Sequence, residues 1–117
     1  MKFSLFLKDT HMGVVESLKK KHSATSNEEI IKKYVKSAIQ LQNDDLIFGS
    51  AREQCGGGCF SSEPQFEIDM DEDDFNKLRS IYQNYEIEEY DTEEEEISKT
   101  IRCIINFIDY QPESISI

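Results

Sequence analysis

Two short stretches of this chain share one alternation of apolar and polar side chains. They are KFSLFLKD at residues 2–9 and QFEIDMDE at residues 65–72. The apolar positions are Phe3, Leu5 and Leu7 in the first stretch, and Phe66, Ile68 and Met70 in the second. Strict alternation is typical of a strand with one buried face. Each apolar residue of the first stretch has its counterpart 63 residues later, so the chain contains one short strand twice.

The helical patterns that follow the strands repeat as well. Residues 10–21 and 73–84 carry apolar residues at spacing three, which is typical of an amphipathic helix. The matched positions are Met12, Val15 and Leu18, and then Phe75, Leu78 and Ile81. A second helical pattern follows at residues 24–42 and again at 91–111, now at an offset of 67. The change of offset indicates about four extra residues in the turn near 87–91, where loops tolerate insertions.

Polar residues mark where each helix is expected to begin. Their side chains can accept a hydrogen bond from the orphan amides of the first turn. We expect Asp9 or Thr10 to cap the first helix, and Asp71 and Thr92 to cap the third and fourth. Two overlapping capping boxes open the second helix: Thr25 with Glu28, and Ser26 with Glu29. The expected core comprises Val15, Leu18, Ile30, Tyr34, Leu78, Ile81, Ile97, Ile101, Ile104 and Ile105.

The net charge of −11 is divided unevenly along the 117 residues. Residues 1–42 hold eight lysines and four acids, a net charge of +4, whereas residues 43–117 hold five basic and twenty acidic residues, a net charge of −15. We therefore expect a basic repeat at 1–42, a linker or hairpin at 43–63 and an acidic repeat at 64–117. No apolar run approaches the ~18 residues of a membrane helix. Three cysteines, an odd number, argue against a secreted disulfide scaffold. We expect a cytoplasmic protein.

The string CGGGC at residues 55–59 is the most distinctive local motif. Cys55 and Cys59 could form a disulfide or bind a soft metal. A structural zinc site needs four ligands, and the other candidates are Cys103, in an apolar helix stripe, and His11 and His22, which we expect at the surface. We favour a flexible hairpin tip with no metal or cofactor. The chain has no glycine-rich phosphate loop between a strand and a helix and no nucleophile–base pattern, so we expect no catalytic activity.

A short strand followed by two helices, with a serine or threonine opening the second, resembles the ribbon-helix-helix superfamily of the Arc and methionine repressors. The resemblance covers residues 2–42 and 64–110. In that family two copies pair their strands into an antiparallel ribbon over a four-helix core. The resemblance thus implies a mainly α fold with a small antiparallel β-ribbon, in which strand–helix–helix occurs twice as a pseudo-twofold pair within one chain. The family often has glycine in the interhelix turn, but KKHSATS and YEIEEYDT have none.

The resemblance also implies which positions would meet DNA. The family reads the major groove with the outward side chains of the ribbon and holds phosphate at the start of the second helix. In repeat 1 these positions are Lys2, Ser4, Phe6, Lys8, Ser26 and Asn27. In repeat 2 they are Gln65, Glu67, Asp69 and Asp71, with Glu93, Glu94, Glu95 and Glu96 at the helix start. The acids of repeat 2 would repel a phosphate backbone. We expect them to form an acidic surface for a basic partner instead, made by Glu67, Asp69, Asp71, Glu93, Glu94, Glu95 and Glu96.

Pairing of the repeats decides between two functions. Pairing within one chain joins the lysines of repeat 1 to the acids of repeat 2, and we favour it because opposite charges on neighbouring strands attract. The protein would then be a monomer that inhibits or sequesters a basic nucleic-acid-binding protein, as an antitoxin, immunity protein or nucleic-acid mimic does. If repeat 1 instead pairs with repeat 1 of a second chain, the homodimer would be a DNA-binding transcriptional repressor or antitoxin. We expect no interaction with membranes in either case.

Overall fold

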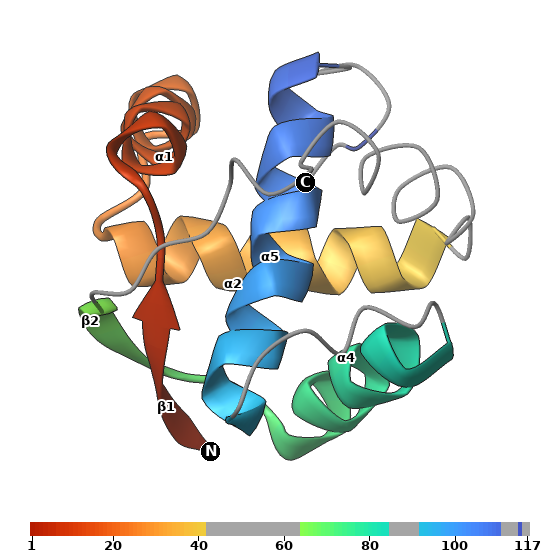
Figure 1. Ribbon diagram of the computed structural model, residues 1–117. Helices are drawn as coiled ribbons and strands as arrows, with labels where there is room; N and C mark the ends of the chain where they lie inside the picture. Colours follow the sequence, from red (N-terminus) through yellow and green to blue (C-terminus); the bar gives the residue numbers. More distant parts are fainter. Residues whose placement is uncertain (42–63, 85–91, 111–114, 116–117) are drawn as a thin grey trace.

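The computed structural model describes residues 1–41, 64–84, 92–110 and 115 (Figure 1). It is mainly helical, with one small two-stranded antiparallel sheet. Along the chain the described elements are β1 (Lys2–Phe6), α1 (Asp9–Lys21), α2 (Asn27–Leu41), β2 (Pro64–Asp69), α4 (Glu72–Asn84) and α5 (Glu93–Tyr110). The expected linker at 43–63, with Cys55 and Cys59, lies outside the described residues.

The two strands with matching sequences pair with each other. β1 runs antiparallel to β2, with Phe3 opposite Ile68 and a register shift between Leu5 and Phe6. The expected antiparallel ribbon is therefore confirmed. One face of the ribbon is buried. Its side chains are Phe3, Leu5 and Leu7, in and just after β1, and Ile68 and Met70, in and just after β2. The alternating sequence places all the apolar side chains on one face, because successive side chains of a strand point to opposite faces.

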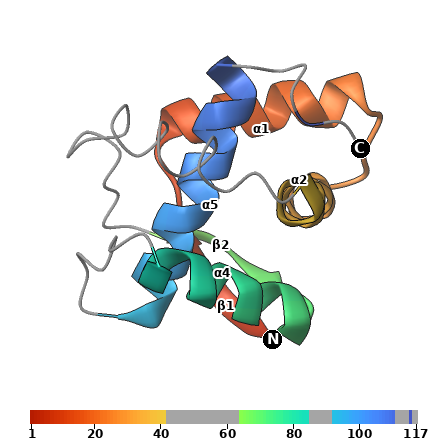
Figure 2. The same ribbon diagram turned by 90° about the vertical axis from the view of Figure 1, so that its right-hand side faces the viewer.

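The four described helices pack together against the ribbon. Figures 1 and 2 show α5 in the middle, with α1 near its end and α4 near its start. α1 contacts both α2 and α5, and α4 likewise contacts both α5 and α2. α5 also lies along β1, whereas the packing of α2 along β2 is much weaker. None of the described helices combines the length and the apolar character that crossing a bilayer requires.

The residues expected in the core are buried, with one exception. Leu18 is only partly buried and packs on the edge of the core. The ribbon and the helices meet in the same core, where the rings of Phe3 and Phe75 form an edge-to-face contact at 5.4 Å. Such aromatic pairs add to the stabilisation from area burial.

The second and fourth helices begin at the predicted serine and threonine caps, but the expected pairing of Thr25 with Glu28 is wrong, because the Thr25 amide donates to Glu29 and Glu28 accepts from the Asp69 amide. Ser26 Oγ accepts a hydrogen bond from the Glu29 amide at 3.1 Å, and Thr92 Oγ1 accepts one from the Glu95 amide at 3.3 Å. Asp71 directly precedes the first residue of α4.

The prediction for the first helix is wrong, because Lys8 holds the cap position and Asp9 and Thr10 already lie within α1. The side chain of His11, the third residue of α1, reaches back to the cap residue. Its Nδ1 accepts a hydrogen bond from the Lys8 amide at 3.1 Å.

The turn between α1 and α2 explains how the chain manages without glycine there. Ser23 has a φ of 52°, in the left-handed region that glycine usually occupies at a helix end. The Ala24 amide donates to the Lys19 carbonyl at 3.0 Å, and the Ser23 amide donates to the Lys20 carbonyl at 3.3 Å. These two bonds satisfy the last carbonyls of α1, and the serine adopts this backbone at a cost of roughly 1 kcal/mol.

Candidate functional site

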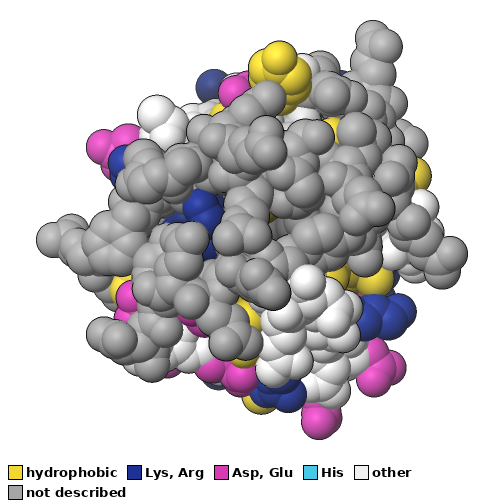
Figure 3. All heavy atoms as spheres, turned by 45° about the vertical axis from the view of Figure 1, so that its right-hand side comes forward, with side chains coloured by type: hydrophobic (Ala, Val, Ile, Leu, Met, Phe, Trp, Pro, Cys, Tyr) yellow, Lys and Arg dark blue, Asp and Glu magenta, His cyan; other side chains and the backbone are white. Residues whose placement is uncertain are grey.

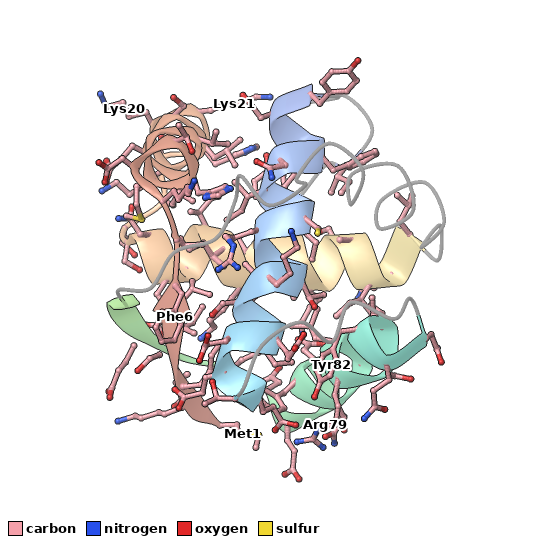
Figure 4. All side chains as sticks on the ribbon, in the orientation of Figure 1. Met1, Phe6, Lys20, Lys21, Arg79 and Tyr82 are labelled. Atoms are coloured by element: carbon pink, nitrogen blue, oxygen red, sulfur yellow. The ribbon has the colours of Figure 1, made fainter. Side chains whose placement is uncertain are left out.

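The outer face of the ribbon brings the basic and acidic candidate residues side by side. Ser4 lies opposite Glu67, and Lys2 lies opposite Asp69. The side chains of Lys2, Glu67 and Asp69 are exposed, whereas Ser4 and Phe6 are half-buried. Figure 4 labels Phe6 on β1. Lys8 follows the strand and is also half-buried. The structure therefore joins the two sets of ribbon residues into one mixed surface.

Two of the three ribbon acids have a positively charged partner. Asp69 Oδ1 lies 2.7 Å from the amino group of Met1, and this hydrogen bond and charge lower the pKa of Asp69. Asp71 Oδ2 lies 3.2 Å from the Lys36 ammonium, which is also 3.7 Å from Asp74. The hydrogen bond with Asp71 and the charge of Asp74 raise the pKa of Lys36.

Glu67 is the remaining ribbon acid. It is exposed, and with the described residues it makes no hydrogen bond or ion pair. Its negative charge is therefore available to a partner. A substitution here removes charge without breaking a contact among the described residues.

The first acid of α5 is tightly held. Arg79 of α4 donates two hydrogen bonds to the Glu93 carboxylate, at 2.8 and 2.7 Å, and the Tyr82 hydroxyl donates a third at 3.1 Å. Figure 4 labels Arg79 and Tyr82 beside the start of α5. The arginine hydrogen bond is the main cause that lowers the pKa of Glu93, and burial raises the pKa of Tyr82. Glu93 thus joins α4 to α5.

The next three acids have different surroundings. Glu94 is exposed, and its Oε2 accepts a hydrogen bond from the Ser4 amide at 2.6 Å. Glu95 is half-buried and accepts a hydrogen bond from Thr92 Oγ1 at 3.0 Å. Glu96 is only 4% exposed, so the assignment of this residue to an exposed acidic surface is wrong. The side of α5 that carries Glu96 is buried as well as its apolar face. Glu96 therefore cannot contact a partner.

On the face that Figure 3 draws, magenta and dark-blue side chains of the described residues alternate along the lower edge. This mixing agrees with the ion pairs between Arg79 and Glu93 and between Lys36 and Asp71. The local field is therefore weaker than the sequence charge suggests, because the two charges of each ion pair offset one another.

A polar stripe on α5 covers the free edge of β1. Ser98 Oγ accepts a hydrogen bond from the Phe6 amide at 3.0 Å and donates one to the Ser4 carbonyl at 3.4 Å. Arg102 Nη1 donates to the Phe6 carbonyl, and Glu94 accepts from the Ser4 amide. Both edges of β1 are thus occupied, one by β2 and one by α5. The periodicity of the apolar residues did not predict this role, although Glu94, Ser98 and Arg102 recur at every fourth position and so share one side of α5.

The two helix-start residues of the DNA-binding alternative make contacts within the protein. Ser26 caps α2, and Asn27 Nδ2 donates to Glu16 Oε1 of α1 at 3.1 Å. The lysines Lys19, Lys20 and Lys21 lie in the last turn of α1, where Figure 4 labels the latter two. Lys19 is 3.5 Å from Glu16.

The expectation that His11 lies at the surface is wrong. Its side chain is 2% exposed, between α1 and α5. Burial lowers the pKa of His11 from 6.5 to about 4, and the nearby charges of Arg102 and Lys8 lower it further. His22 is half-buried and its Nε2 lies 2.7 Å from the Tyr34 hydroxyl. Both histidines therefore hold helices together.

Cys55 and Cys59 lie outside the described residues. Cys103 is a free, buried thiol on α5. In the described parts of the chain, no group of three or more histidine, cysteine or acidic side chains is placed to hold a metal ion.

Comparisons of the chain with protein-family models, with curated proteins and with solved structures find no match. The site presents the exposed carboxylate of Glu67 on a short ribbon, flanked by acids that internal contacts hold in place.

Proposed function

We propose that this chain is a small acidic binding protein without catalytic activity, which occupies the nucleic-acid site of a basic partner protein. We also propose that its two strand–helix–helix halves form a ribbon-helix-helix pair within one chain. The order of the elements and the antiparallel pairing of β1 with β2 support this architecture. So do the matching contacts of α1 and α4 with the two second helices.

The observation that carries the proposal is the pairing of the two strands within one chain. It places Glu67 and Asp69 on the outer face, beside Ser4 and Lys2. DNA carries one phosphate charge per ~1.7 Å of helix axis, and a ribbon with these acids repels it. The same carboxylates attract the lysines and arginines that a nucleic-acid-binding protein uses for phosphate.

Internal contacts order the acids that lie near Glu67. Glu94 is hydrogen-bonded to the Ser4 backbone, and Asp71 is paired with Lys36. Carboxylates that are already ordered lose less side-chain entropy when a partner binds. Glu67 supplies the most accessible charge, which steers a basic protein and speeds association.

The alternative, a DNA-binding repressor built from two copies of repeat 1, requires a different ribbon. β1 would have to leave β2 to pair with β1 of a second chain. The edge hydrogen bonds from Ser98 and Arg102 would have to re-form around the new ribbon. This rearrangement opposes the alternative.

A competition assay tests the proposal. Protamine, an arginine-rich DNA-binding protein, is bound to fluorescent duplex DNA, and the chain is added at several salt concentrations. We expect the chain to release the DNA, less so as salt rises, and Glu67→Lys to slow its association with protamine. Sub-micromolar binding of the chain to the duplex itself, abolished by Lys2→Ala, would support the repressor instead.

Asp109→Lys is the matched control for Glu67→Lys. Asp109 is exposed, and its replacement by lysine changes the net charge by the same amount as Glu67→Lys. It lies in the last turn of α5. At 1.5 Å per residue it is ~22 Å from Glu94 along the helix, well beyond the ~8 Å Debye length at physiological salt. Equal slowing by both variants would show that only net charge matters, and that the ribbon is not the contact surface.

A further inference from the structure

An open groove lies on the side of the molecule formed by α1 and the last turns of α5. Its volume is about 480 Å³. The half-buried Val14 and Leu18 and the buried Ile108 supply its apolar part. Exposed residues form the rest: Thr10, Gly13, Ser17, Lys21 and Asp109. None of the ribbon residues lines this groove.

Charge is distributed along α1 in a way that complements an antiparallel copy of the same helix. Asp9 is in its first turn, and Lys19, Lys20 and Lys21 are in its last turn. If a second α1 lies antiparallel in the groove, each acidic start meets a basic end. A twofold axis makes this contact occur twice, as in any isologous dimer. The two helix dipoles are then also antiparallel.

One register of the two antiparallel α1 helices pairs opposite charges and also places small residues where the helices cross. Asp9, Gly13, Ser17 and Lys21 follow one another at every fourth residue, so they form one ridge on α1. The crossing that places Asp9 opposite Lys21 of the second copy also places Gly13 opposite Ser17. Two small residues then face each other where the helices cross, and the backbones can approach closely.

Gly13 gives this register independent support. A methyl group added at Gly13 would have no atom of the described residues within 4 Å, and the Gly13 backbone is helical with no positive φ. Packing among the described residues therefore does not require glycine. Glycine is nevertheless less favourable than alanine inside a helix. A close approach by a second molecule accounts for its presence.

We propose that this groove binds α1 of a second copy of the chain, antiparallel, in a weak symmetric dimer. The groove is small, so the interface belongs at the low end of the size range for specific complexes. The dimer leaves the outer face of the ribbon open, so it is independent of the proposed function.

Sedimentation equilibrium over a range of concentrations tests the dimer, with thermal denaturation of each variant measured at low concentration. We expect the wild-type chain to show a monomer–dimer equilibrium. Gly13→Ala should raise the melting temperature of the monomer and weaken the dimer about tenfold. A variant that is more stable as a monomer but associates more weakly cannot have lost the dimer through unfolding. A wild-type chain that stays monomeric at about 1 mM would overturn it, and so would a dimer that Gly13→Ala leaves unchanged.

A charge exchange tests the register. Asp9→Lys alone should weaken the dimer, and the double variant Asp9→Lys with Lys21→Asp should restore it. Glu72→Lys is the matched control, because Glu72 is an exposed acid in the first turn of α4 and does not line the groove. Failure of the double variant to restore the dimer, or equal weakening by Glu72→Lys, would show that the helices do not meet in this register.

Discussion

The two second helices, α2 and α5, have similar sequences but different surroundings. α2 buries one stripe: Ile30, Ile31, Tyr34, Val35 and Ala38. α5 is buried without interruption from Glu96 to Ile105, which covers every side of the helix. The pattern in the sequence identified the inner face of both helices. It did not indicate that the outer face of one would also be covered.

Aligned positions show where the two helices diverge. At the offset of 67, Ile31 corresponds to Ser98, and Val35 corresponds to Arg102. The apolar pair enters the core, whereas the polar pair bonds to the backbone of β1. α5 lies along β1, and α2 has no comparable packing along β2. α5 thus covers the edge of β1 with several groups, whereas on β2 the Asp69 amide donates to Glu28 of α2 at 2.8 Å. A strand edge that is left uncovered exposes unpaired amides and carbonyls.

The largest effect should come from positions where the two helices remain equivalent. Ile30 and Ile97 correspond at the offset of 67 and are 1% and 0% exposed. Ile30→Ala and Ile97→Ala should each lower the free energy of unfolding by about 2–5 kcal/mol, the usual range for truncation in a core. Urea denaturation measures both. A loss under about 0.5 kcal/mol at either site would mean that the inner faces are not equivalent.

His11 provides a contrast between the first helices that depends on pH. At the offset of 63 its counterpart is Asp74, which lies 3.7 Å from Lys36 of α2, whereas His11 is buried against α5. The pKa of His11 is about 4 in the folded protein, against 6.5 ordinarily. Between pH 6.5 and pH 4 the imidazole is therefore protonated in the unfolded chain but neutral in the folded chain. Stability falls through this window by up to about 3 kcal/mol.

His11→Asn isolates that effect, because the Asn oxygen can still accept the hydrogen bond of the Lys8 amide but does not titrate. Urea denaturation between pH 7 and pH 4 should show a shallower loss of stability for the variant than for the wild type. Carboxylates contribute equally to both proteins, so only the difference between the curves is compared. Parallel curves would mean that the imidazole titrates normally in the folded state.

A smaller effect is expected at the polar stripe of α5. Ser98→Ala removes the acceptor for the Phe6 amide and the donor to the Ser4 carbonyl, both at a partly buried edge. We expect a loss of about 1–2 kcal/mol and faster hydrogen exchange at the Phe6 amide. Ser80→Ala, at an exposed position of α4, is the control for the change in helix propensity. Unchanged exchange at Phe6 would mean that α5 does not protect this edge.

Short-range patterns determined much of the fold from the sequence alone. The alternation around Phe3 and Ile68 predicted two strands, and their shared offset predicted that they pair. The periodicity of Ile97 and Ile101 predicted the inner face of α5, and Ser26 and Thr92 predicted helix starts. These features depend on neighbours within a few residues, or on the rule that an apolar face must be covered.

Only the tertiary structure decided which polar groups remain exposed. Lys32 and Lys99 correspond at the sequence offset of 67, yet Lys32 is half-buried and Lys99 is 2% exposed. Glu96 and His11 are likewise buried, and Glu93 is held by Arg79. Periodicity marks the face of a helix that must avoid water, but the environment of the opposite face depends on which distant elements reach it. For a charged side chain that environment decides whether it binds a partner or holds the fold together.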